Sequence, residues 1–308
     1  MHASTAHIPP SRIRIIAAFA SIYVLWGSTY LAIRFGVETI PPMLMAGARH
    51  FIAGVLLYAW TRSRGAPRPT RAHWRSATLV GALLLAGGNG GVTWAVQHVP
   101  SGLASVVIAT VPLWMVFLDW VRPRGVRPRG ATIVGLALGL VGIVLLVDRD
   151  DRNKLAVDAS LDVIGAGTLV LAALSWAIGS LYSRHARLPS MLLHSAAMQM
   201  LTGGAVLAAL GCALGEPARL QLADVSLRSF LGFGYLVIFG SVVGFTSYVW
   251  LLRVCPASTV ATYAYVNPVV ALFLGWAFAS EQLAPRTLVA ASTIVVAVAV
   301  VIRYREAK

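Results

Sequence analysis

The chain has 308 residues, of which 58% are hydrophobic and only 12% are charged, and its formal net charge is +14. Because soluble domains carry about 25% charged residues, this composition and the mean hydropathy of +0.76 exclude an ordinary soluble protein. The arginines lie in short clusters between apolar runs, without a basic helix or an aromatic–basic RNA motif. The positive charge therefore indicates membrane topology rather than a nucleic-acid partner.

Apolar runs long enough to cross a bilayer as helices recur along the whole chain, separated by prolines and arginines. A signal peptide is not expected, because only Ile15–Ala17 would form its apolar core, against roughly 7–15 residues required. We predict an all-α integral membrane protein with ten transmembrane helices. These helices are expected at residues 13–35, 43–60, 75–97, 101–120, 130–147, 161–184, 191–214, 228–252, 257–280 and 286–304.

The distribution of Lys and Arg predicts that both termini lie in the cytoplasm. With that orientation, 17 of the 25 basic residues fall in cytoplasmic segments and 7 in outer segments, and Arg49 lies within a helix. Cytoplasmic loops of membrane proteins are enriched in these residues. The largest clusters are five arginines within residues 62–75 and four within 122–129. We therefore expect these two segments on the same side of the membrane.

In the first and third helices, polar and aromatic residues share helix faces. Trp26, Thr29 and Tyr30 lie on one face of the first helix, and Asn89 and Thr93 lie on one stripe of the third. Polar groups are costly in hydrocarbon unless they face a cavity or a partner helix. We therefore predict that these residues line a substrate site, although packing between helices is the alternative for Trp26 and for Trp176 of the sixth helix.

The second helix contains Arg49 and His50, an arginine and a histidine that lie away from the ends of the span. Arg49 lies about seven residues, roughly 10 Å, from the outer end. It can extend outward to the interface, or contact backbone carbonyls and help to bind a carboxylate. We favour a structural role, because the residue 150 positions later is the neutral Gln199. His50 is the candidate for proton coupling within the membrane.

The chain contains an internal duplication. The stretch LASVVIATVPLWMVFLDW (103–120) resembles TVATYAYVNPVVALFLGW (259–276), and an offset of 156 aligns Pro112 with Pro268 and Gly88 with Gly244. Further upstream an offset of 150 aligns Trp26 with Trp176, Arg34 with Arg184 and Gly54 with Gly204. We expect repeats at residues 1–150 and 151–308. Each holds five helices, an odd number, so the second repeat is inverted relative to the first, as in many transporters.

The second repeat supplies further candidates for substrate binding. The sixth helix carries Trp176 and Ser180, the eighth carries Tyr248, and the ninth carries Thr259, Thr262, Tyr263 and Asn267 on one face spanning roughly 140°. The equivalent face of the fourth helix is aliphatic, and this asymmetry favours an amphipathic substrate. Pro112 and Pro268 remove backbone N–H groups in mid-membrane, which predicts gating kinks or, equally, bends required for packing.

Several stretches resemble the EamA-type branch of the drug/metabolite transporter superfamily. They are YVLWGSTYLAIRFGVETIPPMLMAGARH, VPSGLASVVIATVPL, SWAIGSLYSR and CPASTVATYAYVNPVVALFLGWAFASEQL. The resemblance implies ten helices, cytoplasmic termini, and export or exchange of small metabolites across the bacterial inner membrane. Members often carry an acidic residue after both the fourth and ninth helices. Glu281 occupies the second place, whereas Gly125 occupies the first.

Together these features predict a secondary transporter, an exporter of small amphipathic metabolites such as amino acids, that works by alternating access. A channel or facilitator is the alternative, followed by a membrane-embedded enzyme, although neither an HExxH nor a GxGD motif occurs. With two cysteines, Cys212 and Cys255, the chain offers no metal cluster. We expect no cofactor; the predicted partners are a small-molecule substrate and the lipid bilayer, and the driving force and oligomeric state stay open.

Overall fold

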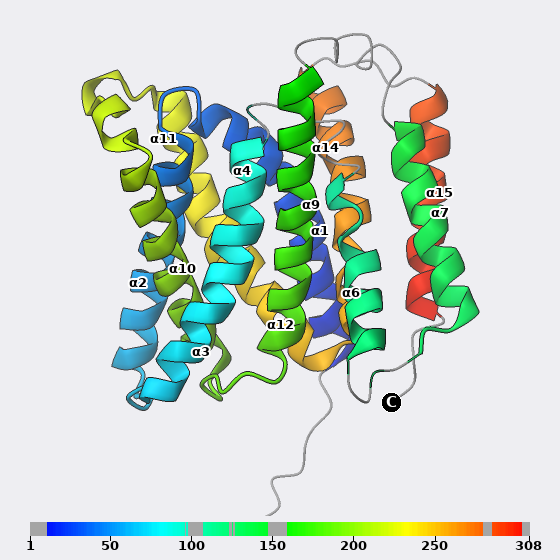
Figure 1. Ribbon diagram of the computed structural model, residues 1–308, viewed down its shortest axis with the longest axis horizontal. Coiled ribbons are helices and arrows are strands. Elements are labelled where there is room, and N and C mark those ends of the chain that lie inside the picture. The colour runs from blue at the N-terminus through cyan, green and yellow to red at the C-terminus, as the bar shows by residue number, and fades with distance from the viewer. Residues whose placement is uncertain are drawn as a thin grey trace, which may run out of the picture.

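The computed structural model describes residues 11–95, 97, 107–122, 125, 127–146, 159–279 and 285–303. All regular elements in these ranges are helical, and the helices stand side by side as a bundle (Figure 1). Five of them are long and apolar enough to cross a membrane by length and composition. The predicted all-α membrane fold, with ten helical spans in two inverted repeats, is confirmed.

In the first repeat, the first, second and fifth helices follow the predicted spans closely. Ser11 caps the first helix through a hydrogen bond from Arg14 N, and Pro42 occupies the first turn of the second, where its missing N–H costs no bond. The elements are α1 (Arg12–Gly36), α2 (Pro42–Ser63), α3 (Arg71–Gly81), η1 (Ala82–Gly90), α4 (Gly91–Ala95), α6 (Val111–Val121) and α7 (Gly130–Leu146).

The second repeat has the same order of spans, with two short 3-10 turns added after its second long helix. Ser226 caps the span that follows these turns. The elements are α9 (Ala159–Ser183), α10 (Leu192–Ala213), η2 (Glu216–Arg219), η3 (Leu222–Asp224), α11 (Leu227–Tyr235), η4 (Leu236–Phe245), α12 (Thr246–Val254), α13 (Ala257–Val260), α14 (Tyr263–Ala279) and α15 (Pro285–Arg303).

Equivalent helices of the two repeats run in opposite directions (Figure 1). We call the end of the bundle where α1 begins the lower end and the opposite end the upper end. α2 descends from the upper end while its counterpart α10 ascends beside it, and α7 packs in the same antiparallel way against α15. α1 begins and α15 ends at the lower end. The repeats are thus inverted relative to each other.

Backbone contact between α2 and α10 depends on a pair of repeat-related glycines. A Cβ at Gly54 would lie 2.6 Å from Leu201 N, and a Cβ at Gly204 would lie 2.5 Å from Phe51 N. Since helices in a membrane gain little from hydrophobic burial against each other, close approach through small residues is a main source of their packing energy. The two glycines therefore join the repeats at equivalent points.

The third and eighth spans each contain a π-helical segment, η1 and η4, at equivalent positions of the two repeats. This corrects the prediction of uninterrupted helices at 75–97 and 228–252. A π-helix widens the turn and changes which side chains share a face, and such segments occur often at functional sites. The segment η1 contains Gly88, and η4 contains its repeat equivalent, Gly244.

The ninth span and the described part of the fourth are also interrupted. The ninth is not one helix over 257–280: α13 ends at Val260, a turn follows at residues 261–262, and α14 begins at Tyr263. Pro112 does not kink a continuous helix either. It lies in the first turn of α6, after a turn at residues 109–110, where a missing N–H is tolerated. Pro268 does lie inside a helix, α14.

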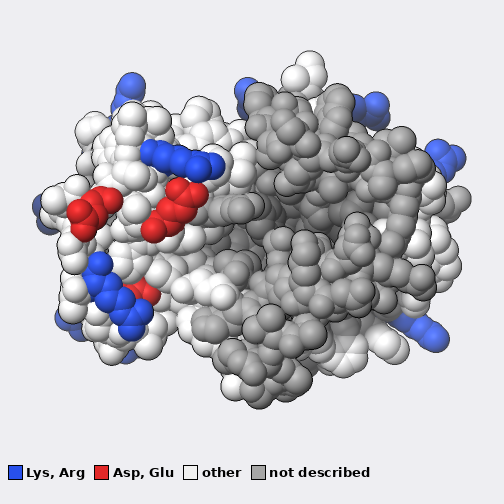
Figure 2. Space-filling model, turned by 90° about the horizontal axis from the view of Figure 1, so that it is seen from above, with Lys and Arg blue, Asp and Glu red and all other residues white. Residues whose placement is uncertain are grey.

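Charge separates between the two ends of the bundle. Of the described acidic residues, Glu38, Glu216 and Asp224 belong to the upper end, whose surface Figure 2 shows together with a few arginines, whereas Asp119 lies at the lower end beside Arg122. The arginines of segment 62–75 and the described arginines within 122–129 lie at the lower end, where α2 and α6 finish (Figure 1). The two segments therefore lie at the same end of the bundle, as the prediction of a shared membrane side requires.

Candidate functional site

A pocket lies between the two repeats, about midway along the bundle and toward the upper end. The space between its lining atoms, including open solvent at its mouth, is about 760 Å³. Both repeats contribute to it. The lining residues are Trp26, Thr29, Ile33, Arg49, His50, Leu85, Gly88, Asn89, Val92, Ile108, Val111, Ala172, Ala173, Trp176, Gly240, Phe245, Tyr263 and Asn267.

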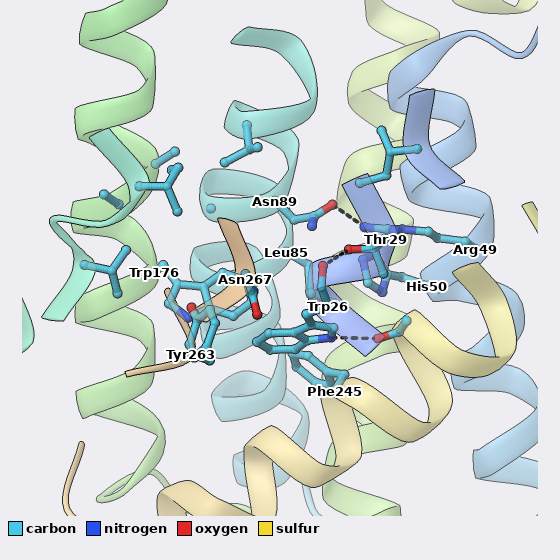
Figure 3. Close-up of a pocket in the computed structure, with 18 residues that line it drawn as sticks. Trp26, Thr29, Arg49, His50, Leu85, Asn89, Trp176, Phe245, Tyr263 and Asn267 are labelled. Carbon is cyan, nitrogen blue, oxygen red and sulfur yellow. Dashed lines mark hydrogen bonds between the residues drawn. The ribbon is translucent and has the colours of Figure 1, made fainter. Parts of the chain in front are cut away.

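Four aromatic side chains at the lower side of the pocket pack together, and we call Trp26, Trp176, Tyr248 and Tyr263 the aromatic layer (Figure 3 labels three of them). Ring centroids of its neighbouring members are 4.9–5.7 Å apart. Trp26 Nε1 donates to the Gly240 carbonyl at 3.1 Å, and Trp176 Nε1 donates to Tyr248 Oη at 2.8 Å. With their polar atoms bonded, the rings leave apolar faces toward the pocket.

The two tryptophans are held by glycines of the opposite repeats. A Cβ at Gly88, in the first repeat, would lie 2.6 Å from Trp176 Cε3, and a Cβ at Gly244, in the second, would collide with Trp26 Nε1. Trp26 and Trp176 also contact each other edge to face. Each repeat thus packs a glycine against the tryptophan of the other repeat. The approximate two-fold axis that relates the repeats therefore passes near the aromatic layer.

On the side of the pocket opposite Trp176 and Tyr263 lie three polar residues, Arg49, His50 and Asn89, which we call the polar wall (Figure 3). Arg49 Nη2 donates to Asn89 Oδ1 at 2.6 Å. His50 Nδ1 and Ser241 Oγ share a hydrogen bond of 3.2 Å. Arg49 Nε and His50 Nε2 have no hydrogen-bond partner among the described residues, although Asn89 also lies near His50. The polar wall thus has side-chain nitrogen atoms that remain able to form hydrogen bonds with a ligand.

Below the aromatic layer, a hydrogen bond joins the two repeats and others lie within the second repeat. Tyr23 Oη and Thr262 Oγ1 are 2.6 Å apart, and Thr262 also donates to the Thr259 carbonyl at 2.7 Å. At the lower end Arg184 Nη1 donates to the Cys255 carbonyl at 2.8 Å. Burial lowers the pKa of this guanidinium, and the charge of Asp119 partly offsets the effect. These contacts close the bundle beneath the pocket.

Comparison with known proteins agrees with this architecture. The model of the EamA-like transporter family matches the chain twice, at residues 13–148 and 163–303.

The chain belongs to the EamA-like transporter family.

Curated relatives and a solved structure agree with this membership. The uncharacterized inner membrane transporter YedA of Escherichia coli K12 is 41% identical over 93% of this chain and 90% of its own. The uncharacterized transporter YoaV of Bacillus subtilis is 26% identical over 88% of this chain and 90% of its own. A crystal structure with 22% identity superposes with a TM-score of 0.77 over 96% of this chain and 100% of the other, which supports the fold. The predicted EamA resemblance is confirmed.

In this EamA-family chain, the structure brings part of the predicted site together. Eight predicted residues line the pocket: Trp26, Thr29, Arg49, His50, Asn89, Trp176, Tyr263 and Asn267. Trp26 and Trp176 both pack between helices and line the pocket, so the two alternatives hold at once. Arg49 is only 3% exposed and does not extend to the interface, so of the two directions that the sequence left open it takes the inward one.

The other predicted residues whose side chains the structure describes, Tyr248 included, do not line the pocket. Ser180 is buried against Tyr248 Oη at 2.5 Å, and Thr93 bonds the Asn89 carbonyl at 2.8 Å. Thr259 and Thr262 lie before the start of α14 and are buried below the aromatic layer, so the four polar residues of the ninth span do not share one cavity-facing surface. The side chain of Tyr30, and Glu281, lie outside the described residues.

Asn267 has a second role besides lining the pocket. With its amide oriented to satisfy its neighbours, the nitrogen donates to the carbonyls of Ile22 (3.3 Å), Tyr23 (3.2 Å) and Tyr263 (3.1 Å). Asn267 thus fastens α14 to the middle of α1. A polar side chain inside the bundle is stabilised there because it bonds backbone carbonyls of a neighbouring helix.

The sequence prediction missed the apolar and glycine lining. Leu85, Val92, Ala172 and Ala173 belong to apolar helices in which lipid-facing and pocket-facing residues have the same composition. Gly240 contributes its carbonyl to Trp26, and the π-helix that places it had no recognised sequence signal. The periodicity of a regular α-helix was the only guide available, and the π segments shift that periodicity.

The chemistry of the pocket is that of a binding site. Among the described lining residues, one arginine and one histidine are the ionisable side chains besides Tyr263, and no carboxylate accompanies them. The described residues contain no group of three or more His, Cys, Asp or Glu that could hold a metal ion. The combination of large aromatic faces with a few polar groups suits a small organic molecule.

Proposed function

We propose that this transporter is a secondary carrier that exports small amphipathic metabolites, such as amino acids, across the bacterial inner membrane by alternating access. The observation that carries the proposal is the pocket between two inverted repeats, above an aromatic layer to which each repeat contributes a tryptophan. Two near-equivalent halves can exchange conformations, so that a site between them faces one side of the membrane and then the other.

The described conformation corresponds to one of the two states. The pocket lies on the upper side of the aromatic layer, while the hydrogen bond between Tyr23 and Thr262 joins the two repeats below it. The excess of arginines at the lower end supports a cytoplasmic position for that end and for both termini. In this orientation the pocket belongs to an outward-facing state.

The inner membrane and the substrate class have separate support. The Escherichia coli relative is described as an inner membrane transporter, and its 41% identity supports the same membrane for this chain. The aromatic layer supplies an apolar surface, whereas the polar wall supplies donors on the opposite side (Figure 3). A molecule with an apolar body and a polar head fits both surfaces.

Counterflow in proteoliposomes tests this function. Vesicles preloaded with an unlabelled amino acid should accumulate the labelled amino acid transiently and saturably, and a Trp176→Leu variant should lose most of this uptake. Gly167→Ala is the matched control, because its Cβ would meet no atom within 4 Å among the described residues. Non-saturable conductance would instead indicate a channel, and formation of a new product would indicate an enzyme.

The direction of transport needs a cellular test. A strain that overexpresses the chain should tolerate a toxic amino-acid analogue better than the empty-vector strain and should accumulate less of it. Greater accumulation and greater sensitivity would indicate uptake and contradict export.

A further inference from the structure

Arg49 carries a positive charge that no described carboxylate balances. Its side chain is 3% exposed and lines the pocket. The ion pairs found among the described residues join Arg122 to Asp119 and Arg228 to Glu38, both near the ends of the bundle. Neither involves Arg49.

An unbalanced guanidinium at this depth is energetically costly. A buried charge requires an ionic partner or several hydrogen bonds to offset its desolvation. Arg49 has the neutral Asn89 oxygen at 2.6 Å, and its Nε has no partner among the described residues. The guanidinium points into the pocket toward Asn89 instead of toward the upper end (Figure 3). Both its orientation and its free donor direct it toward a ligand.

We propose that the Arg49 guanidinium binds a carboxylate of the transported molecule. The inference rests on the proposed function and specifies the substrate class of the same site. Guanidinium and carboxylate form strong charge-assisted hydrogen bonds, and the planar donor set matches the two oxygens. Asn89 positions the guanidinium, and the imidazole of His50 lies beside it as a further donor or acceptor.

The rest of the ligand is defined by the opposite side of the pocket. The aromatic layer and the aliphatic lining accept an apolar or aromatic body. No described lining residue is acidic, so a substrate ammonium finds carbonyl oxygens and ring faces rather than a carboxylate. We therefore assign the site to small monocarboxylates with an apolar body, amino acids included, for which the carboxylate contributes more to affinity than the amine.

The repeat relation explains why this anchor is present on one side only. The residues equivalent to Arg49, His50 and Asn89 are Gln199, Met200 and Phe245. Gln199 is fully buried and bonds Ser195 Oγ at 3.1 Å, away from the pocket lining. Arg49→Gln therefore introduces the side chain that the other repeat already accommodates at the same place in the fold.

Four ligands that form a two-by-two set test the proposal on the purified full-length protein. L-phenylalanine has both groups, L-phenylalaninamide has the amine alone, 3-phenylpropanoate has the carboxylate alone and 3-phenylpropanamide has neither. Dissociation constants are measured by intrinsic tryptophan fluorescence, since Trp26 and Trp176 lie at the pocket. We expect each acid to bind about 10- to 100-fold more tightly than its amide.

Variants then assign that preference to a residue. Arg49→Gln should bring the acid-to-amide ratio close to one, and Arg49→Lys should retain part of it. Gln199→Leu, at the equivalent buried position outside the pocket lining, is the control and should leave the ratio unchanged. The ratio within one protein is independent of how much of each variant folds, because acid and amide are compared on the same sample.

The outcomes separate the two proposals. Equal binding of acids and amides by the unmodified protein overturns the carboxylate assignment and leaves the carrier function standing. A preference that survives Arg49→Gln overturns Arg49 as the anchor. If none of the four ligands binds, the proposed substrate class fails, and the assignment of Arg49 fails with it.

Discussion

The two repeats of this transporter share a scaffold but present different chemistry to the pocket. Their equivalent helices pack through equivalent glycines, Gly54 and Gly204, and both carry a π segment and a tryptophan at the centre. The residues that distinguish them lie on the walls. The first repeat has Arg49, His50 and Asn89 where the second has glutamine, methionine and phenylalanine.

This difference separates positions that maintain the fold from positions that select the ligand. Gly54 and Gly204, which meet the backbone of the opposite repeat, are the same residue in both copies, because both must bring the helices close there. Residues that face the pocket can diverge, because the pocket binds one asymmetric molecule. Substitutions at the first class should change stability, and substitutions at the second should change selectivity.

The largest effect is expected at the scaffold glycine Gly204. Gly204→Ala would place a Cβ 2.5 Å from Phe51 N and 2.9 Å from the Gly47 carbonyl, and the backbone of α2 cannot move aside locally. We expect a loss of about 3 kcal/mol of stability, seen as a large fall in the thermal unfolding midpoint in detergent. Gly167→Ala, on open helix surface, should be neutral or slightly stabilising. Equal midpoints for the two variants would contradict the role of Gly204.

The next effect concerns a contact that only one repeat possesses. Glu216, 4% exposed, accepts bonds from Met43 N at 3.2 Å and Leu44 N at 2.8 Å and so caps the start of α2. The equivalent start of α10 has no side-chain cap. Glu216→Ala should lower stability by about 2 kcal/mol, because it leaves two N–H groups unpaired beside the helix dipole.

Two variants sharpen this prediction. Glu216→Gln keeps one oxygen acceptor and should lose roughly half as much stability. Asp224→Ala, an exposed acidic residue at the same end, should leave the unfolding midpoint unchanged. A midpoint for Glu216→Ala equal to that of Asp224→Ala would show that the cap contributes nothing.

A change in selectivity is expected at Asn89, which positions Arg49. Asn89→Leu removes the acceptor at 2.6 Å from Arg49 Nη2 and frees the guanidinium to rotate. The affinity for 3-phenylpropanoate should fall about 5- to 10-fold, while that for 3-phenylpropanamide stays the same. Thr93→Val, which removes a bond to the Asn89 backbone, is the control. Equal losses for both ligands would mean that Asn89 acts on pocket shape alone.

Much of the scaffold could be predicted from the sequence because it depends on strong, local signals. Apolar length located the ten spans, arginine counts placed segments 62–75 and 122–129 at one end, and the aligned tryptophans and glycines revealed the duplication. Trp26, Trp176, Tyr263 and Asn267 were found because such residues are unusual in hydrocarbon. These features need no knowledge of how helices pack.

The remainder required three-dimensional information. The π segments and the break at residues 261–262 changed which side chains share a face, so Thr259 and Thr262 were wrongly assigned to the cavity. For Arg49 the sequence left two directions open, and only the packing of α2 against η1 and η4 selects the inward one. Apolar lining residues such as Leu85 carry no signal that distinguishes a pocket from lipid.

The smallest effect is expected at the hydrogen bond between Tyr23 and Thr262, which is also specific to one side. Their equivalents in the other repeat are Ala173 and Val106, which cannot form such a bond. In the described conformation this 2.6 Å contact stabilises the lower end of the bundle. In the opposite conformation, the equivalent residues would supply no such bond at the upper end. Tyr23→Phe should shift the equilibrium toward opening of the lower end by about 1 kcal/mol, or about 5-fold.

The buried Cys255, at the lower end, reports this shift. In a Cys212→Ser background, its labelling by a maleimide in inside-out vesicles should accelerate about 5-fold in Tyr23→Phe and in Thr262→Val. Because both variants remove the bond between Tyr23 and Thr262, the double variant should label no faster than Thr262→Val alone. Tyr265→Phe, whose hydroxyl bonds the Leu136 carbonyl in α7, is the control. Fully additive rates would mean that the two residues stabilise the lower end independently, and the asymmetry between the repeats would then be confined to the polar wall.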